Sequence, residues 1–154
     1  MYQTYSFKAC AGSFSHPNAS IGTFQFYGQI GMGEFIVRMV TERGQLLMAA
    51  DGTPLVYYIA GANGEIEIQV QQTSSLHDFL LNWANIVMGE ADQQQLSDFA
   101  AATLTVTNNV DGSSHVCTGV FPTKIPDKTY APAPQMLTWR LMCADIKNTT
   151  ASPN

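Results

Sequence analysis

The segment from Glu65 to Gln71 alternates polar and apolar side chains without interruption. Successive side chains of a β-strand point to opposite faces, so the pattern places one set of residues on each face. The apolar set is Ile66, Ile68 and Val70, and the polar set is Glu65, Glu67, Gln69 and Gln71. The segment therefore predicts a strand with one face on a hydrophobic core and the other on water.

Strand-like segments recur along most of the chain, and one amphipathic helix interrupts them. The predicted strands cover residues 5–14, 21–27, 30–40, 104–107, 115–121 and 136–146, with a short helical turn at 93–99. Ser75 as an N-cap and an apolar stripe at three- and four-residue spacing predict a helix over 74–88. The sequence thus predicts a mainly β protein, an antiparallel β-sandwich or partial barrel with one flanking helix. We expect one domain over residues 1–147 and a flexible tail over 148–154.

A long connection separates two of the predicted strands. It runs from about Thr41 to Gly64 and contains the turn signals Asp51-Gly52 and Gly61-Ala62-Asn63-Gly64. Between these turns lies an apolar segment, residues 55–59. Around 20 residues is long for a plain loop, so we expect a projecting arm over residues 41–64.

The chain is poor in charge. Charged residues make up 12% of its 154 residues, about half of the ~25% that is typical of globular domains. Such a monomer would have a poor surface for solubility, so we expect other molecules to cover much of it. The net charge of −5 and the absence of any Lys/Arg cluster disfavour nucleic-acid binding. No apolar run approaches the ~20 residues that cross a bilayer, so no membrane anchor is expected, and the N-terminal residues do not read as a secretory signal.

Motifs for catalysis or cofactor binding are absent from the sequence. His16, His77 and His115 show no metal-ligand spacing, and there is no nucleophile elbow or phosphate-binding glycine loop. We therefore predict no catalytic, cofactor-binding or metal-binding residue, and a protein that is not an enzyme. His77 is expected to be solvated. Cys10, Cys117 and Cys143 lack CxxC spacing, which leaves two interpretations: small buried hydrophobes, or pairing within or between chains.

The order of motifs resembles the tail tube proteins of contractile-tailed bacteriophages. In chain order the motifs are Tyr5-Ser6-Phe7-Lys8, His16-Pro17-Asn18-Ala19-Ser20, Gly31-Met32-Gly33-Glu34-Phe35, Ala50-Asp51-Gly52, Gly64-Glu65-Ile66-Glu67-Ile68-Gln69-Val70 and Thr73-Ser74-Ser75. Ser75 stands where the family usually has Pro, and His77 where it commonly has Asn. Both changes are compatible with helix initiation, because Ser is itself a good cap. The C-terminal third matches in layout more than in residues.

The resemblance implies a structural virion protein. Six copies would form a ring, and rings would stack helically into a hollow tube inside a tail sheath, with baseplate and tail-terminator proteins at its ends. DNA would pass through the lumen without specific binding. The protein would be assembled in the host cytoplasm and reside in the virion tail. Two alternatives remain: a tube protein of a type VI secretion system or another contractile injection machine, which shares the fold, and an isolated binding β-sandwich.

Within this resemblance, three sets of residues acquire expected roles. The polar strand face predicts a lumen lining of Glu65, Glu67, Gln69 and Gln71, with Glu34 and Arg38. The arm predicts a ring-stacking element through Leu46, Leu47, Met48, Leu55, Val56, Tyr57, Tyr58 and Ile59. The third set is Cys10, Cys117 and Cys143, as candidates for disulfides between subunits in an oxidising environment.

Overall fold

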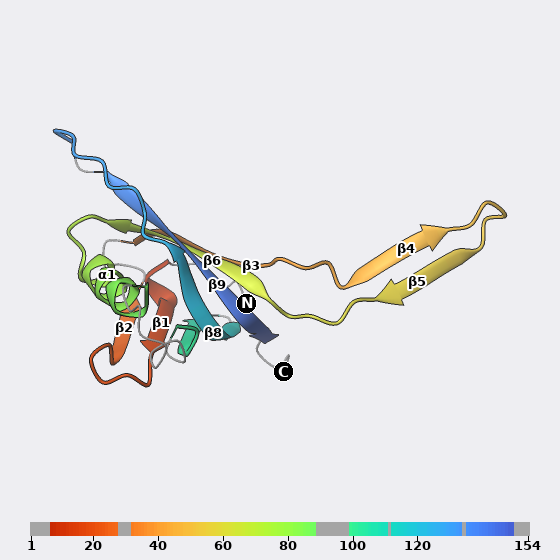
Figure 1. Ribbon diagram of the computed structural model, residues 1–154, viewed down its shortest axis with the longest axis horizontal. Helices are drawn as coiled ribbons and strands as arrows, with labels where there is room; N and C mark the ends of the chain where they lie inside the picture. Colours follow the sequence, from red (N-terminus) through yellow and green to blue (C-terminus); the bar gives the residue numbers. More distant parts are fainter. Residues whose placement is uncertain (1–6, 28–31, 89–98, 111, 134, 150–154) are drawn as a thin grey trace.

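Seven strands form one antiparallel sheet in the computed structural model, which describes residues 7–27, 32–88, 99–110, 112–133 and 135–149 (Figure 1). The strand order is β2-β1-β7-β8-β9-β6-β3. The strands are β1 (Cys10–Ser15), β2 (Thr23–Tyr27), β3 (Met32–Met39), β6 (Gly64–Gln71), β7 (Ala102–Asn108), β8 (Ser114–Lys124) and β9 (Met136–Thr149). A 3₁₀ turn, η1 (Phe7–Ala9), precedes β1. The mainly β, antiparallel fold predicted from the sequence is confirmed.

The sheet curls until its two edge strands approach each other. Phe26 on β2 and Phe35 on β3 bring their ring centroids to 6.1 Å, although β2 and β3 occupy opposite ends of the strand order. Of the two architectures that the sequence left open, the body therefore adopts the partial barrel. The curl leaves a cavity of about 210 Å³ beside these rings, lined also by Cys10, Val37 and Val106.

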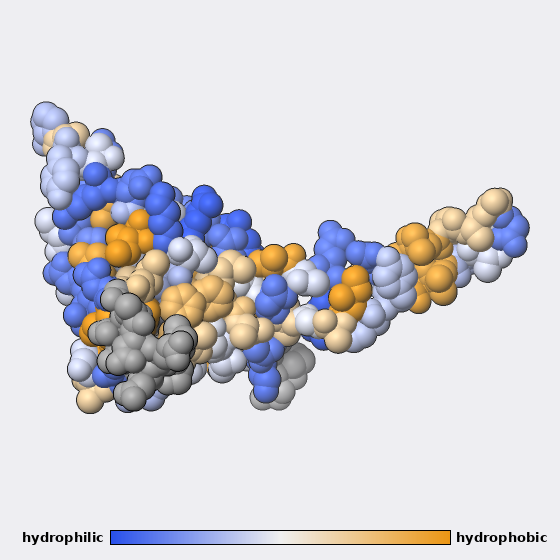
Figure 2. All heavy atoms as spheres, viewed as in Figure 1, coloured by the Kyte–Doolittle hydropathy of each residue, from blue (hydrophilic) through white to orange (hydrophobic). Residues whose placement is uncertain are grey.

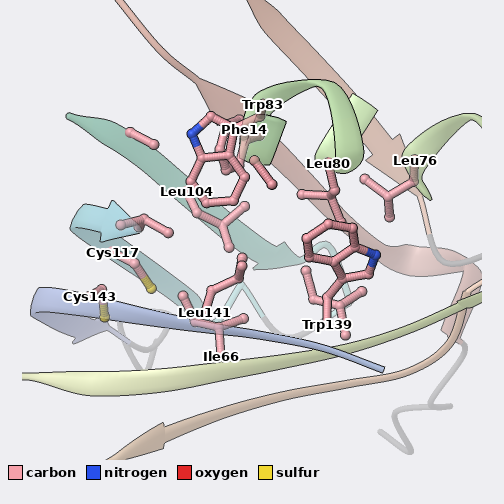
Figure 3. Close-up of a cluster of buried hydrophobic side chains, with 14 of the residues drawn as sticks. Phe14, Ile66, Leu76, Leu80, Trp83, Leu104, Cys117, Trp139, Leu141 and Cys143 are labelled. Carbon is pink, nitrogen blue, oxygen red and sulfur yellow. The ribbon is translucent and has the colours of Figure 1, made fainter. Parts of the chain in front are cut away.

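The one long helix among the described residues covers the apolar face of the sheet (Figure 3). Helix α1 (Ser75–Met88) buries its Leu76, Leu80 and Trp83 side chains against the core. The sheet supplies Phe14, whose ring meets that of Trp83 edge-on at 4.7 Å, and Ile66, which is fully buried. The alternation in the β6 segment is thereby explained, because its apolar residues face the helix and its polar residues face away.

The helix begins on a different cap from the one expected. The Ser74 hydroxyl, not that of Ser75, accepts the His77 backbone N–H at 3.1 Å. Ser74 is the N-cap and Ser75 is the first helical residue. Each apolar residue of the helix therefore lies one position further from the cap than the sequence predicted. Both serines are good caps by residue type. Ser74 becomes the cap because it lies in the turn between β6 and α1, where its N–H donates to the Gln71 carbonyl.

His77 is buried, so the expectation that it is solvated is wrong. Only 4% of the residue is exposed, and the Trp139 indole N–H donates to its Nδ1 at 3.2 Å. Burial lowers the pKa of His77, an effect that Lys128 reinforces and Asp78 opposes. The helical pattern alone could not reveal this, because the partner, Trp139, lies 62 residues away on β9.

Several predicted boundaries shift. β8 continues through the buried Pro122 to Lys124, beyond the expected end at residue 121, and a register shift follows the proline. β9 ends at Thr149, so Asn148 and Thr149 pair with β8 rather than start a tail. Residues 150–154 and 93–98, where the rest of the tail and most of a helical turn were expected, lie outside the described residues.

The arm predicted over residues 41–64 projects from the body as a separate two-stranded hairpin (Figure 1). Its strands are β4 (Gly44–Met48) and β5 (Pro54–Tyr58). The hairpin pairs with no other strand of the described chain. The described part of the chain thus consists of a curled body, one covering helix and one extended arm.

Candidate assembly surfaces

The six residues expected to line a lumen lie on one face of the sheet. Their strands β3 and β6 are neighbours, and the register pairs Arg38 with Glu65 and Glu34 with Gln69. Residues that pair across an antiparallel ladder project from the same face, and β6 carries Glu67 and Gln71 on that face as well. This surface, which we call the polar face, points away from α1, because the alternate residues of β6 face the helix.

The charges of the polar face are mixed rather than acidic. The Arg38 guanidinium forms a 2.6 Å ion pair with the Glu67 carboxylate, across β3 and β6. On the other side of β6, Arg140 of β9 lies opposite Glu67, and Lys124 of β8 lies opposite Arg140. With Arg140 and Lys124 added, three basic residues lie near the three carboxylates of Glu34, Glu65 and Glu67, and Lys124 itself pairs with Asp127 at 3.2 Å, so this surface has no basic excess. Within β9 the exposed Arg140 alternates with the buried Trp139 and Leu141, but only the strand register shows that it lies opposite Glu67.

The arm exposes apolar side chains on both of its faces. Figure 2 shows those that lie along the side in view. The register pairs Leu46 with Val56 and Leu47 with Leu55, and adjacent pairs point to opposite sides. One face, called face A, carries Leu46, Met48, Val56 and Tyr58. The other, face B, carries Leu47, Leu55, Tyr57 and Gln45. Ile59, expected to belong to this surface, lies beyond β5 and is half-buried.

The tip of the arm is a tight turn built on the Ala50-Asp51-Gly52 motif. The Asp51 carboxylate accepts the Thr53 backbone N–H at 2.9 Å, and Gly52 adopts a φ of 87° that favours glycine. Hydrogen bonds from the backbone N–H and side chain of Thr53 lower the pKa of Asp51. The turn keeps a charge and polar backbone at the end of an otherwise apolar hairpin.

The root of the arm is tied to the body through Asn63 and its neighbour. Val40 donates its backbone N–H to the Asn63 carbonyl at 3.2 Å, and the Thr41 hydroxyl donates to the Asn63 side-chain oxygen at 2.7 Å. The Ile146 N–H of β9 donates to the Ala62 carbonyl at 2.8 Å. These bonds fix where the arm leaves the sheet.

Two of the three cysteines lie in the core. Cys117 and Cys143 are 0% and 2% exposed on neighbouring strands β8 and β9, and Figure 3 shows both within the buried cluster. The hydrogen bond with Cys143 and burial raise the pKa of the Cys117 thiol far above its usual range. Both thiols are free, and this fold gives a neighbouring chain no access to them. Cys10, half-buried beside the cavity of the barrel, remains the candidate for contact between chains.

Neither a metal site nor a membrane-spanning helix is found in the described part of the chain. No three His, Cys, Asp or Glu residues there lie close enough to hold an ion. Within the same ranges no helix has the length and apolarity needed to cross a bilayer.

Comparison with known proteins finds one matching family and solved structures that share this fold. The family described as "Bacteriophage PhiTE tail tube protein" matches residues 2–150. No curated protein sequence matches the chain. A chain of the anti-feeding prophage baseplate, solved by cryo-electron microscopy with 6-fold symmetry, superposes with a TM-score of 0.61 at 13% identity, covering 99% of this chain and 100% of that one. A chain of the anti-feeding prophage tube-terminating cap gives 0.57 at 8% identity, covering 98% and 93%. These structures share the fold.

Proposed function

We propose that this chain, a member of the bacteriophage PhiTE tail tube protein family, assembles as hexameric rings. The rings would stack helically into a hollow conduit for DNA. Membership of the family makes the chain a structural component of a tail tube. The observation that carries this proposal is the arm, with seven large apolar side chains exposed outside the core. A hairpin of this kind is stable in water only when another surface covers it. The poverty of charge in the whole chain agrees with a surface that is largely covered.

The two edges of the curled sheet support ring formation. Neither β2 nor β3 has a second strand partner among the described residues. Unpaired edges invite uncontrolled pairing, and a closed ring of sheets removes them. Joining the β3 edge of one copy to the next copy would also continue the polar face from subunit to subunit around a central bore.

The polar face supports a lumen that does not retain DNA. Phosphate backbones bind to surfaces with an excess of Lys and Arg, because neutralising phosphates releases counterions. On this face Arg38 is paired with Glu67, and Arg140 lies opposite Glu67 in the register of β6 and β9. Balanced charges and amide side chains leave no basic excess to hold DNA in place.

The arm is the proposed ring-stacking element, and its removal tests the function. Replacing Leu46–Ile59 with a short Gly-Ser turn should leave rings but no tubes in negative-stain micrographs. Long tubes from this variant would contradict the proposal. Conversion of Asp51 to Asn, which alters the turn but keeps both apolar faces, is the matched control and should still form tubes.

The remaining partners follow from a place in a contractile tail. A sheath would surround the tube, baseplate and tail-terminator proteins would contact its ends, and assembly in the host cytoplasm would precede incorporation into the virion. A role in another contractile injection machine is the second candidate, because the structural neighbours come from such a particle. The phage family match favours the tail tube.

A further inference from the structure

The curl of the sheet leaves a cavity that is lined by β1, β2, β3, β7 and β8. Its volume is about 210 Å³, and the rings of Phe26 and Phe35 form part of its wall. An apolar cavity of about 150 Å³ is large enough to bind benzene. The additional volume of about 60 Å³ has room for about two more non-hydrogen atoms, at the ~30 Å³ that one water molecule occupies in the liquid. The cavity therefore has the size of a small aromatic molecule.

The wall of the cavity changes from apolar to polar along β7 and β8. Val106 of β7 pairs with His115 of β8, and both residues line the cavity. Two residues further along β7, the Asn108 backbone N–H donates to the Ser113 carbonyl at 2.9 Å, and these residues line the cavity as well. An apolar pocket with a few polar groups is typical of small-molecule sites, which also occur in the mouths of β-barrels.

The His115 imidazole is held in one tautomer by its partner on β9. Its Nδ1 lies 2.6 Å from the side-chain oxygen of Asn148. A carbonyl oxygen only accepts hydrogen bonds, so Nδ1 carries the hydrogen, and Nε2 of the neutral ring keeps its lone pair. His115 therefore brings one acceptor nitrogen to a cavity whose other walls include aromatic and aliphatic side chains.

We propose that this cavity binds a small neutral aromatic molecule that carries one hydroxyl group, with phenol as the model ligand. The aromatic ring would lie against Phe26, Phe35 and Val106, and the hydroxyl would donate a hydrogen bond to Nε2 of His115. The site is independent of tube assembly, because it needs only the interior of one folded chain.

The residues of the lining disfavour other classes of ligand. None of the described residues that line the cavity is Asp, Glu, Lys or Arg, so a charged ligand would lose its hydration without gaining an opposite charge. A buried water needs two to four polar partners, which the apolar side of the cavity lacks. The rings of Phe26 and Phe35 favour an aromatic ligand over a saturated one, because aromatic pairs gain more than area burial alone.

Titration of the full-length chain with phenol tests the site. A ligand that binds only the folded state stabilises it, so the midpoint of thermal unfolding should rise with phenol concentration. Toluene, which has the same number of non-hydrogen atoms and no hydroxyl, is the matched ligand. Calorimetric titration gives a dissociation constant for each. A wild-type chain that shows neither a rise in the midpoint nor binding at millimolar phenol would overturn the proposal.

His115→Leu removes the acceptor nitrogen and keeps an apolar side chain in the wall. Phenol should bind to this variant about 2- to 12-fold more weakly than to the wild type, which is the factor that one net hydrogen bond supplies. Toluene should bind to the variant at least as tightly as to the wild type. If the affinity for phenol is unchanged, or if both ligands lose affinity equally, His115 does not accept the hydroxyl and the proposal fails.

Val106→Phe places a larger side chain in the cavity. It should weaken the binding of both ligands at least ~10-fold, because the ring of the new side chain occupies the space that a ligand needs. Val110→Phe, at a 39% exposed position that does not line the cavity, is the control and should bind as the wild type does. Binding that survives Val106→Phe in a folded chain would place the ligand elsewhere and contradict the site. Should Val106→Phe fail to fold, the comparison of phenol and toluene in His115→Leu decides.

Discussion

Phe26 and Phe35 join the two ends of a seven-stranded sheet through side chains rather than backbone hydrogen bonds. Their rings lie 6.1 Å apart and tilted by 32°, and Phe26 is 2% exposed. The contact closes the barrel around its core while leaving the backbone edges of β2 and β3 unpaired. One chain can thereby have a packed interior and still offer two edges to its neighbours.

The Phe26 contact predicts a large effect of truncation on stability. Phe26→Ala should lower the free energy of unfolding by ~3–5 kcal/mol, because it removes a buried ring and leaves a cavity. Tyr27→Ala, at a 48% exposed neighbouring position, should cost far less. Denaturant titration of both variants measures the difference. Equal costs would show that the contact does not hold the barrel closed.

The root of the arm predicts that Gly64 tolerates no side chain. A Cβ there would lie 2.5 Å from the Arg38 carbonyl oxygen and would also collide with Ile146. Since backbone has to move to relieve this clash, Gly64→Ala should destabilise the fold by at least ~1–3 kcal/mol. Gly44→Ala, where a Cβ meets nothing within 4 Å, is the matched control. An equal shift in the thermal unfolding temperature of both variants would contradict this packing.

The buried histidine predicts a dependence of stability on pH. Burial, with a contribution from Lys128, lowers the pKa of His77 below its ordinary value of 6.5, although Asp78 opposes the shift. Below pH 6.5 the unfolded chain therefore binds more protons than the folded one, so stability is fully present above that pH and declines as pH falls toward the folded pKa. His77→Gln does not titrate and should flatten this decline in denaturant titrations at pH 7.5 and 5.5. If the variant loses as much stability between these pH values as the wild type, the loss comes from other titrating groups.

The polar face predicts how a basic lumen would behave. Glu65→Lys is the cleaner change, because Glu67 is already paired with Arg38. Tubes should still form, but DNA ejection should slow, and added salt should restore it by screening phosphate contacts. Asp78→Lys changes the charge equally on the exposed side of α1 and should leave ejection unchanged. Equal ejection by both variants would contradict a lumen placement of Glu65.

The cysteines predict one accessible thiol per folded chain. Cys10 should react with a thiol reagent in the native protein, and Cys117 and Cys143 only after unfolding, because both are buried. A covalent ladder of subunits needs two linkable thiols in each chain. Non-reducing electrophoresis of assembled particles should therefore show nothing larger than a dimer. A ladder of multimers would mean that the core opens during assembly.

Some of this architecture could be predicted from the sequence, where local pattern and tertiary environment agree. The alternation around Ile66 and Ile68 predicted both the strand and the face that meets the core. The apolar stripe predicted α1, and the length and turn signals of residues 41–64 predicted the arm. In each case the periodicity of a single segment carries the information.

The rest depends on which segments meet. The local sequence pattern does not distinguish Ser74 from Ser75 as the helix cap. It also does not show that His77 is buried against Trp139 or that Arg140 lies opposite Glu67, because these contacts join distant segments. The two-sided character of the arm was also hidden, because an apolar run such as residues 55–59 is equally typical of a buried strand. Only the pairing of Leu46 with Val56, and the exposure of both, shows that the hairpin has two apolar faces in water.

Negative-stain electron microscopy of the purified wild-type chain tests the central claim most directly. The account predicts six-fold rings with an open centre and, as concentration rises, hollow tubes of uniform width built from stacked rings. A preparation that remains monodisperse and monomeric at every concentration, with its arm exposed to solvent, would contradict it.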